Sequence, residues 1–196
     1  MSDFDFAFSL FGLLLGFTLV EVLSGLVRSI KLVRTKHREA AASIRIGWLT
    51  PLLALFVLLD VSSYWDNVWS IREHVTVGLD FIFAGLLITG TYYFAASMVF
   101  PDAVADWPNL DDWFWSHRQQ ALVPLFVANT AWMTYVVSMR TSPGEVGTAI
   151  LLQAAYFLPL AIAIFSKRAG IVGTALALLS ATYLCFAFLA ALSRLQ

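Results

Sequence analysis

The sequence predicts an all-α fold: a polytopic membrane protein built as a six-transmembrane-helix bundle with a short interfacial cytoplasmic helix. Its 196 residues are 60% hydrophobic and 13% charged, and this charged share is about half of the roughly 25% found in soluble domains. The apolar residues form six runs close to the roughly 20 residues that a helix needs to cross a bilayer. Lys and Arg are absent from all six runs, and backbone groups in lipid must pair within their own segment. We therefore expect membrane-spanning helices.

The chain is expected to form a single transmembrane domain over residues 1–196. The predicted helices cover approximately Phe6–Val27, Gly47–Tyr64, Val75–Val99, Ala121–Met139, Val146–Phe165 and Gly170–Leu192.

The first predicted helix has two distinct faces. Residues three, four and seven apart share a helix face, so Gly12 and Gly16 lie together and permit close helix contact, within the chain or between copies of a homo-oligomer. A polar stripe on the other face contains Glu21 and ends at Arg28. Acids within a membrane are rare and usually face the bundle interior or a wet cavity. Glu21 is therefore a candidate for an ion pathway, with pairing to Arg28 as the plain alternative.

The second and third predicted helices each carry one acid in the half of the membrane opposite Glu21. Asp60 precedes a polar and aromatic turn, and Asp80 follows the loop that contains His74. Because the two helices are consecutive and antiparallel, both acids are expected at similar depth. The alternatives are that Asp60 bonds to Tyr64 near the interface and that Asp80 is shallow enough to meet water.

An acidic, tryptophan-rich segment, residues 102–120, precedes the fourth predicted helix. Asn109 followed by Asp112 is typical of a helix N-cap with an acid in the first turn. Trp113 and Trp115 suit the headgroup layer. We expect a short interfacial helix here that leads into the fourth helix.

The fourth and fifth predicted helices add the amides of Asn129 and Gln153. Such side chains usually hold helices together, and we include both as candidates for the ion pathway. Cys185 in the sixth helix is the single cysteine of the chain, and we expect a buried, inert thiol.

The basic residues predict the orientation. Nine of the twelve Lys and Arg fall on one side if six helices alternate, and such loops stay cytoplasmic. We therefore expect an integral protein of a bacterial inner (plasma) membrane with both termini outside the cytoplasm. The strip after the first helix, which includes Arg34, Lys36 and Arg38, is a topology signal that also offers contacts to anionic lipid or to a protein partner.

The sequence also argues against several function classes. The net charge of −1 gives no general attraction to nucleic acid. The predicted spans contain no lysine that could form a retinal Schiff base. Haem ligands would have to lie within the spans, whereas the three histidines lie in loops or at a helix end. HExxH, GxSxG, Walker A and CxxC motifs are absent. We expect no enzyme activity, no cofactor and no bound metal.

Two functional hypotheses follow. The first is a small channel or transporter subunit for protons or other cations. In this hypothesis Asp60 and Asp80 gather the cations or protons from outside, and Glu21 is the inner relay or gate, so that Glu21→Gln abolishes flux. The second is a non-transporting sensor, effector or accessory subunit that acts through its basic and acidic tryptophan-rich cytoplasmic loops.

Overall fold

The computed structural model describes residues 2–38, 45–138 and 143–193, with the side chains of 35–38, 143–146, 148, 149 and 152 left undescribed. This part of the chain is entirely helical apart from its loops and one isolated bridge between Arg45 and Asn109. The elements are α1 (Asp3–Arg38), α2 (Leu49–Ser70), α3 (Leu79–Ser97), the 3-10 turn η1 (Val104–Asp106), α4 (Leu110–Ser138), α5 (Pro143–Phe165) and α6 (Ala169–Ser193).

Five of these helices are long and apolar enough to cross a membrane, namely α1, α2, α3, α4 and α6. The apolar stretch described in α5 is shorter and covers Gln153–Phe165. The all-α prediction is thus confirmed, and the abundance of spanning candidates fits a membrane protein. The predicted count of six spans exceeds the five found by length and composition in the described residues.

Several predicted boundaries need correction. The helix predicted as Phe6–Val27 runs from Asp3 to Arg38, because the Lys and Arg of the basic strip are good helix formers. The second helix ends at Ser70 and not at Tyr64, and the third begins at Leu79 and not at Val75. The expected interfacial helix is not a separate element, since α4 runs without a break from Leu110 to Ser138. Asn109 does cap its start, accepting the N–H of Asp111 at 3.2 Å.

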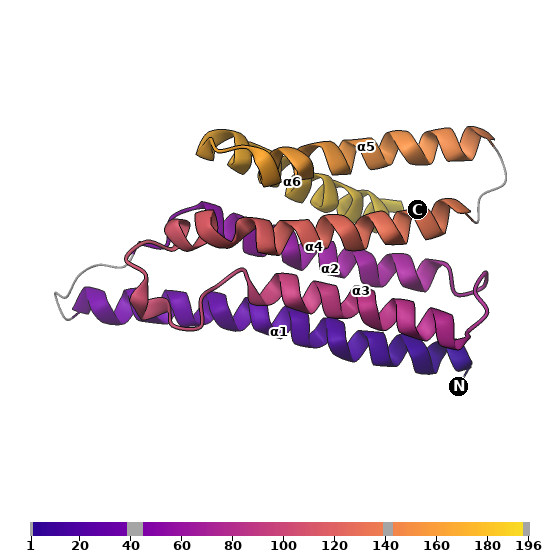
Figure 1. Ribbon diagram of the computed structural model, residues 1–196, viewed down its shortest axis with the longest axis horizontal. Helices are drawn as coiled ribbons and strands as arrows, with labels where there is room; N and C mark the ends of the chain where they lie inside the picture. Colours follow the sequence, from indigo (N-terminus) through magenta and orange to yellow (C-terminus); the bar gives the residue numbers. More distant parts are fainter. Residues whose placement is uncertain (1, 39–44, 139–142, 194–196) are drawn as a thin grey trace.

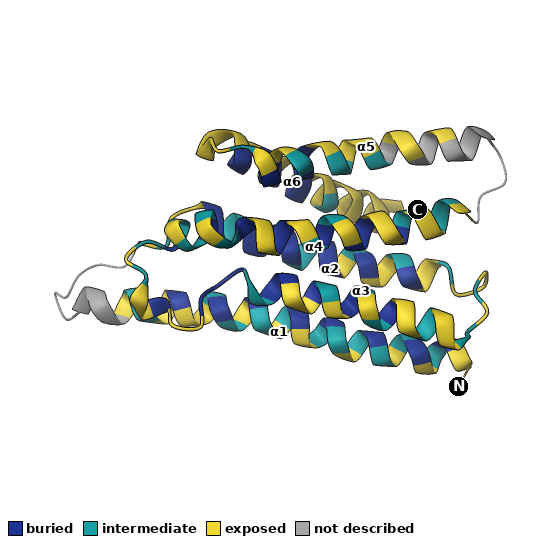
Figure 2. Ribbon diagram, in the orientation of Figure 1, coloured by how far each residue is buried: buried dark blue, intermediate teal, exposed yellow. Residues whose placement is uncertain are grey.

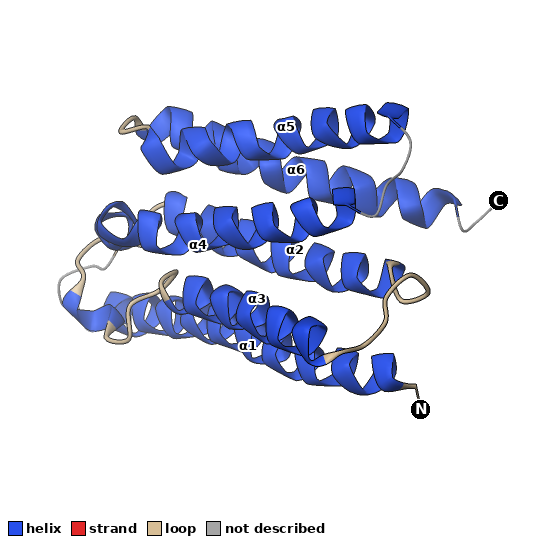
Figure 3. Ribbon diagram, turned by 45° about the vertical axis from the view of Figure 1, so that its right-hand side comes forward, coloured by secondary structure: helices blue, strands red, loops and turns tan. Residues whose placement is uncertain are grey.

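The helices run up and down in three layers of two: α1 with α3, α2 with α4, and α5 with α6 (Figure 1 and Figure 3). Both chain ends lie at one end of the bundle, together with the loop α2–α3; we call this the termini end. The loops α3–α4 and α5–α6 lie at the other end with the start of α2, and we call it the basic end after Arg45, Lys167 and Arg168.

The middle layer is the most buried part of the molecule (Figure 2). Half of the apolar window of α2 is buried, against 22–33% in the other four candidate spans. Large apolar side chains are exposed on the outer helices instead, among them Phe83 at 66% and Phe188 at 64%. Cys185 of α6 is exposed as well, so the expectation of a buried thiol is wrong. Extensive apolar exposure on outward faces is the pattern expected of helices that contact lipid.

Aromatic side chains fill the space that glycines leave open between helices. A Cβ built on Gly12 would lie 2.2 Å from the ring of Trp65 in α2, and one on Gly85 would lie 2.1 Å from the ring of Phe11 in α1. Gly12 therefore packs helices of the same chain. Gly16 has open space around its Cβ position, so the structure assigns it no partner within the chain.

The start of α2 is capped by a carboxylate from α4. Asp111 accepts the backbone N–H groups of Trp48, Leu49 and Thr50 at 3.3, 3.1 and 3.3 Å. Gly47 has φ of 66° and a Cβ there would lie 2.2 Å from the Asp111 carboxyl carbon, so glycine is required at this turn for both reasons. This cap fixes the middle layer at the basic end.

Arg118 closes the end of α5 in a similar way. Arg118 is 6% exposed, and its guanidinium lies 4.4 Å above the ring of Trp115 and donates to the carbonyls of Ala163 and Ser166. A cation at a helix C-terminus satisfies carbonyls that have no partner within the helix. The structure thus gives this basic residue a packing role between α4 and α5.

Candidate functional site

The candidate site is built around one buried acid, Asp60, near the middle of α2. Its side chain is 1% exposed although it lies within the bundle of apolar helices. An unpaired carboxylate in such surroundings is strongly unfavourable. The neighbouring helices therefore have to supply partners.

Three side chains from three other helices donate hydrogen bonds to this carboxylate. Asn129 of α4 donates from Nδ2 to Oδ2 at 3.0 Å. Tyr156 of α5 donates to Oδ1 at 2.9 Å, and Tyr183 of α6 donates to the same oxygen. Tyr92 of α3 extends the network, because its hydroxyl accepts from Asn129 at 3.0 Å. We call these five residues the Asp60 cluster; it joins α2 to every later helix of the bundle.

The orientation of the Asn129 amide follows from its surroundings. Its Nδ2 lies 3.0 Å both from the Asp60 carboxylate and from the carbonyl of Leu125, which only accept hydrogen bonds. The amide nitrogen must therefore face them. As a result, Asn129, Tyr156 and Tyr183 all present hydrogens to Asp60, the arrangement that stabilises a charged carboxylate.

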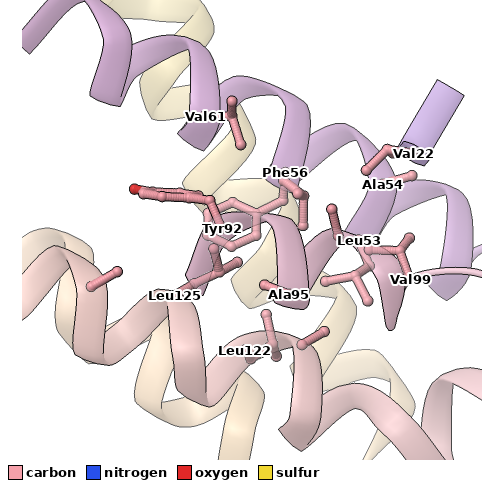
Figure 4. Packing of buried hydrophobic residues seen from close by; sticks show 14 of the residues in the cluster. Val22, Leu53, Ala54, Phe56, Val61, Tyr92, Ala95, Val99, Leu122 and Leu125 are labelled. Atoms are coloured by element: carbon pink, nitrogen blue, oxygen red, sulfur yellow. The ribbon is translucent and has the colours of Figure 1, made fainter. Parts of the chain in front are cut away.

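On the basic side of the Asp60 cluster the bundle is filled by tightly packed side chains. Leu53, Phe56, Leu122 and Leu125 are each 0–1% exposed. Figure 4 shows them with the ring of Tyr92 in one continuous apolar cluster. We call these four residues the apolar plug; it separates Asp60 from the basic end.

On the opposite side of Asp60 a cavity of about 330 Å³ lies between α1, α2, α3 and α4. We call it the upper pocket. Tyr64 and Trp132 line it, and they follow Asp60 and Asn129 by about one helical turn. Their rings pack 5.2 Å apart, and that of Tyr64 lies 5.1 Å from Tyr92. A single aromatic layer thus separates the upper pocket from the Asp60 cluster.

No protein-family model, curated protein or solved structure matches this chain. Its function must therefore be argued from the site alone.

Of the predicted pathway residues, Asp60 and Asn129 come together directly. Asp80 is exposed in the first turn of α3 and lines the upper pocket, so it lies outside the cluster. Glu21 is separate: its carboxylate is 3.6 Å from the guanidinium of Arg28 on the same helix, with 30% of its side chain exposed. Gln153 is half-buried, and among the described contacts none links it to Asp60.

The residues predicted to contact lipid or a partner lie at the basic end. Trp113 donates from Nε1 to the carbonyl of Met98 at 3.0 Å and stacks on the ring of His117, while Trp115 carries the guanidinium of Arg118. Arg34 is exposed. The side chains of Lys36 and Arg38 lie outside the described residues. Both tryptophans therefore have packing roles within the chain, and an outside contact for any of the five stays a prediction.

Sequence reasoning missed the tyrosines of the cluster. The predicted pathway residues include none of Tyr92, Tyr156 and Tyr183. The available signal was their position inside apolar runs, because a buried tyrosine hydroxyl usually finds a hydrogen-bond partner.

Proposed function

We propose that this chain is a small membrane transport protein for protons, with Asp60 as the group that binds the transported proton. The observation that carries the proposal is the burial of one acid, 1% exposed, among donors from α4, α5 and α6. Intramembrane acids with such partners are typical of proton relays.

The chemistry of the partners favours a proton over a metal cation. Asn129, Tyr156 and Tyr183 each direct a hydrogen at the carboxylate. A metal cation needs several oxygen atoms that act as acceptors. A proton can bind to the carboxylate once a single donor turns its hydrogen away from it, and a tyrosine hydroxyl group can do this by rotating.

Protonation of Asp60 is then coupled to helix packing. Tyr156 and Tyr183 share Oδ1, so a proton on that oxygen must displace one of the two hydroxyl groups. Both tyrosines belong to the α5–α6 layer, which packs against α2 and α4. The protonated and ionised forms therefore differ in the bonds that hold this layer in place, which supplies the two-state element that transport requires.

The access to Asp60 supports a transporter rather than an open channel. The upper pocket approaches the cluster from the termini end, and the apolar plug blocks the basic end. Asp60 is thus closed off on both sides, by one aromatic layer toward the upper pocket and by the apolar plug toward the basic end, which is the occluded state that alternating access passes through. In this proposal Asp80 collects cations at the pocket mouth, and Glu21 lies outside the proton-binding site.

The wider membrane arrangement belongs to the same proposal. We place six spans in a bacterial inner membrane: the five candidate spans and, in addition, α5. The termini end then lies outside the cytoplasm. The support is the gathering of the basic loops at the opposite end. We retain a homo-oligomer as the working assembly.

The test is proton flux in proteoliposomes that carry an internal pH-sensitive dye. Asp60→Asn keeps the size of the side chain and removes its charge, and we expect it to abolish flux. Asp66→Asn is the matched control, because Asp66 is an exposed acid on the same helix that does not line the upper pocket. Gel filtration and thermal unfolding establish that both variants are folded. Wild-type flux in folded Asp60→Asn contradicts the proposal.

The rival function, a non-transporting module, has one specific observation in its favour. An open hollow of about 460 Å³ at the basic end brings Arg28 and Lys31 of α1 to Asp102, Ala103 and Val104 beside η1. The basic strip and the acidic segment therefore share one surface. Capture of a stoichiometric partner that is lost in Arg34→Ser, combined with wild-type protein that moves no protons, favours this module.

A further inference from the structure

We infer that the upper pocket binds a small organic ammonium ion, one with a quaternary or protonated amine and an apolar body. Rings line the pocket on both walls. Phe11 and Phe81 lie 5.7 Å apart, edge to face, on the α1 and α3 side. Tyr64, Trp132 and Tyr135 form the α2 and α4 side, with the last two 6.1 Å apart.

The charge of the pocket selects a cation. Asp80 is the one charged side chain among the residues that line it, and no described Lys or Arg does so. Aromatic faces attract cations, and desolvation strengthens this attraction. An ammonium group between the rings and Asp80 therefore meets two sources of negative potential and no repulsion.

The size and shape of the pocket fit a small molecule. Its volume of about 330 Å³ lies in the range of roughly 300–1,000 Å³ found for ligand sites. Small residues, Ala84, Gly85 and Ala131, contribute to its walls. At Gly85 an added Cβ would lie 2.1 Å from the Phe11 ring, so the walls are closely fitted there.

The pocket floor connects this ligand to the proton site. Tyr64 and Trp132 contact the pocket on one side, and Tyr64 packs on Tyr92 of the Asp60 cluster on the other. The ammonium ion is then the substrate whose movement is coupled to the proton on Asp60. This coupling, unlike the binding itself, rests on the proposed proton transport.

Binding is tested by calorimetry on the purified full chain in detergent with benzyltrimethylammonium as the probe. The neutral control ligand is its carbon isostere, neopentylbenzene, which measures apolar partition alone. We expect saturable binding of the cation and about tenfold weaker binding of the isostere. Absence of saturable binding, or equal binding of the isostere, overturns the inference.

Variants locate the site. Asp80→Asn removes its charge and Ala84→Leu fills its space, and each should weaken binding about tenfold or more. Asp66→Asn removes an acid outside the pocket and should bind as the wild type does. Wild-type affinity in both pocket variants places the probe elsewhere and refutes the assignment.

A flux arm separates binding from coupling. In proteoliposomes, an imposed gradient of benzyltrimethylammonium should drive proton movement in the wild type, and Asp60→Asn should bind the probe yet move no protons. Saturable binding with no proton movement under this gradient overturns the coupling while the ligand site stands, and the dye assay of wild type against Asp60→Asn decides separately whether the protein transports protons. Proton flux in the dye assay without saturable binding of the probe overturns the ligand site and leaves the proton-transport proposal standing.

Discussion

Replacing Tyr183 by Phe removes one hydroxyl from the Asp60 cluster and keeps the ring. The hydroxyl donates to Oδ1 of Asp60, which retains Tyr156 at 2.9 Å, while Oδ2 retains Asn129 at 3.0 Å. Hydrogen bonds to charged groups contribute about 1.5–3 kcal/mol to stability. Neutral side-chain bonds between membrane helices average about 0.6 kcal/mol. The size of the loss therefore reports whether the carboxylate is ionised.

We expect Tyr183→Phe to lower the free energy of unfolding by about 1.5–3 kcal/mol, measured by reversible denaturation in mixed micelles. Tyr93→Phe is the matched control: it removes a hydroxyl from a ring that is 44% exposed, and it should change stability by less than about 0.5 kcal/mol.

The same substitution in an Asp60→Asn background completes a double-mutant cycle. With the charge gone, the cost of Tyr183→Phe should fall to about 0.6 kcal/mol. Equal costs in the two backgrounds would refute the reasoning, because the hydroxyl would then contribute nothing that depends on the carboxylate.

Three further predictions concern the framework around the site. Gly12→Ala should destabilise the protein by about 1–3 kcal/mol in thermal unfolding, because its Cβ meets the ring of Trp65, whereas Gly16→Ala in open space should be neutral or stabilising; equal effects would contradict the packing described. Asp111→Ala should cost about 0.5–2 kcal/mol by the same assay, since it uncaps α2, and an unchanged melting temperature would argue against the cap. Glu21→Gln should retain proton flux and lose less than about 1 kcal/mol of stability, because its ion pair is partly exposed; loss of flux would return Glu21 to the pathway.

Part of the site could be predicted from the sequence, because burying a polar residue within an apolar run is unfavourable unless it has hydrogen-bond partners or a function. Asp60 and Asn129 stand out on this basis, and the structure joins them at 3.0 Å. Glu21 stood out equally, yet Arg28 lies seven residues later on the same face and provides a nearby partner. Composition shows that an acid is unusual, but not which partner satisfies it.

Those parts of the fold that depend on hydropathy could be predicted from the sequence. The parts that depend on contacts between distant residues could not. The apolar runs predicted the cores of the helices. The start of α2 depends on Asp111, some sixty residues away in the chain, and no local pattern reports that bond. The same holds for Tyr183, which reaches Asp60 only because α6 packs against α2.

Infrared difference spectroscopy of the protein in lipid, between acidic and alkaline pH, tests most directly whether Asp60 exchanges a proton. The account predicts a protonated-carboxyl band at acidic pH that disappears in Asp60→Asn, persists in Asp66→Asn and is accompanied by changes in tyrosine ring modes. A spectrum that is unchanged by Asp60→Asn would show that this carboxyl group keeps one protonation state throughout, and would contradict the account.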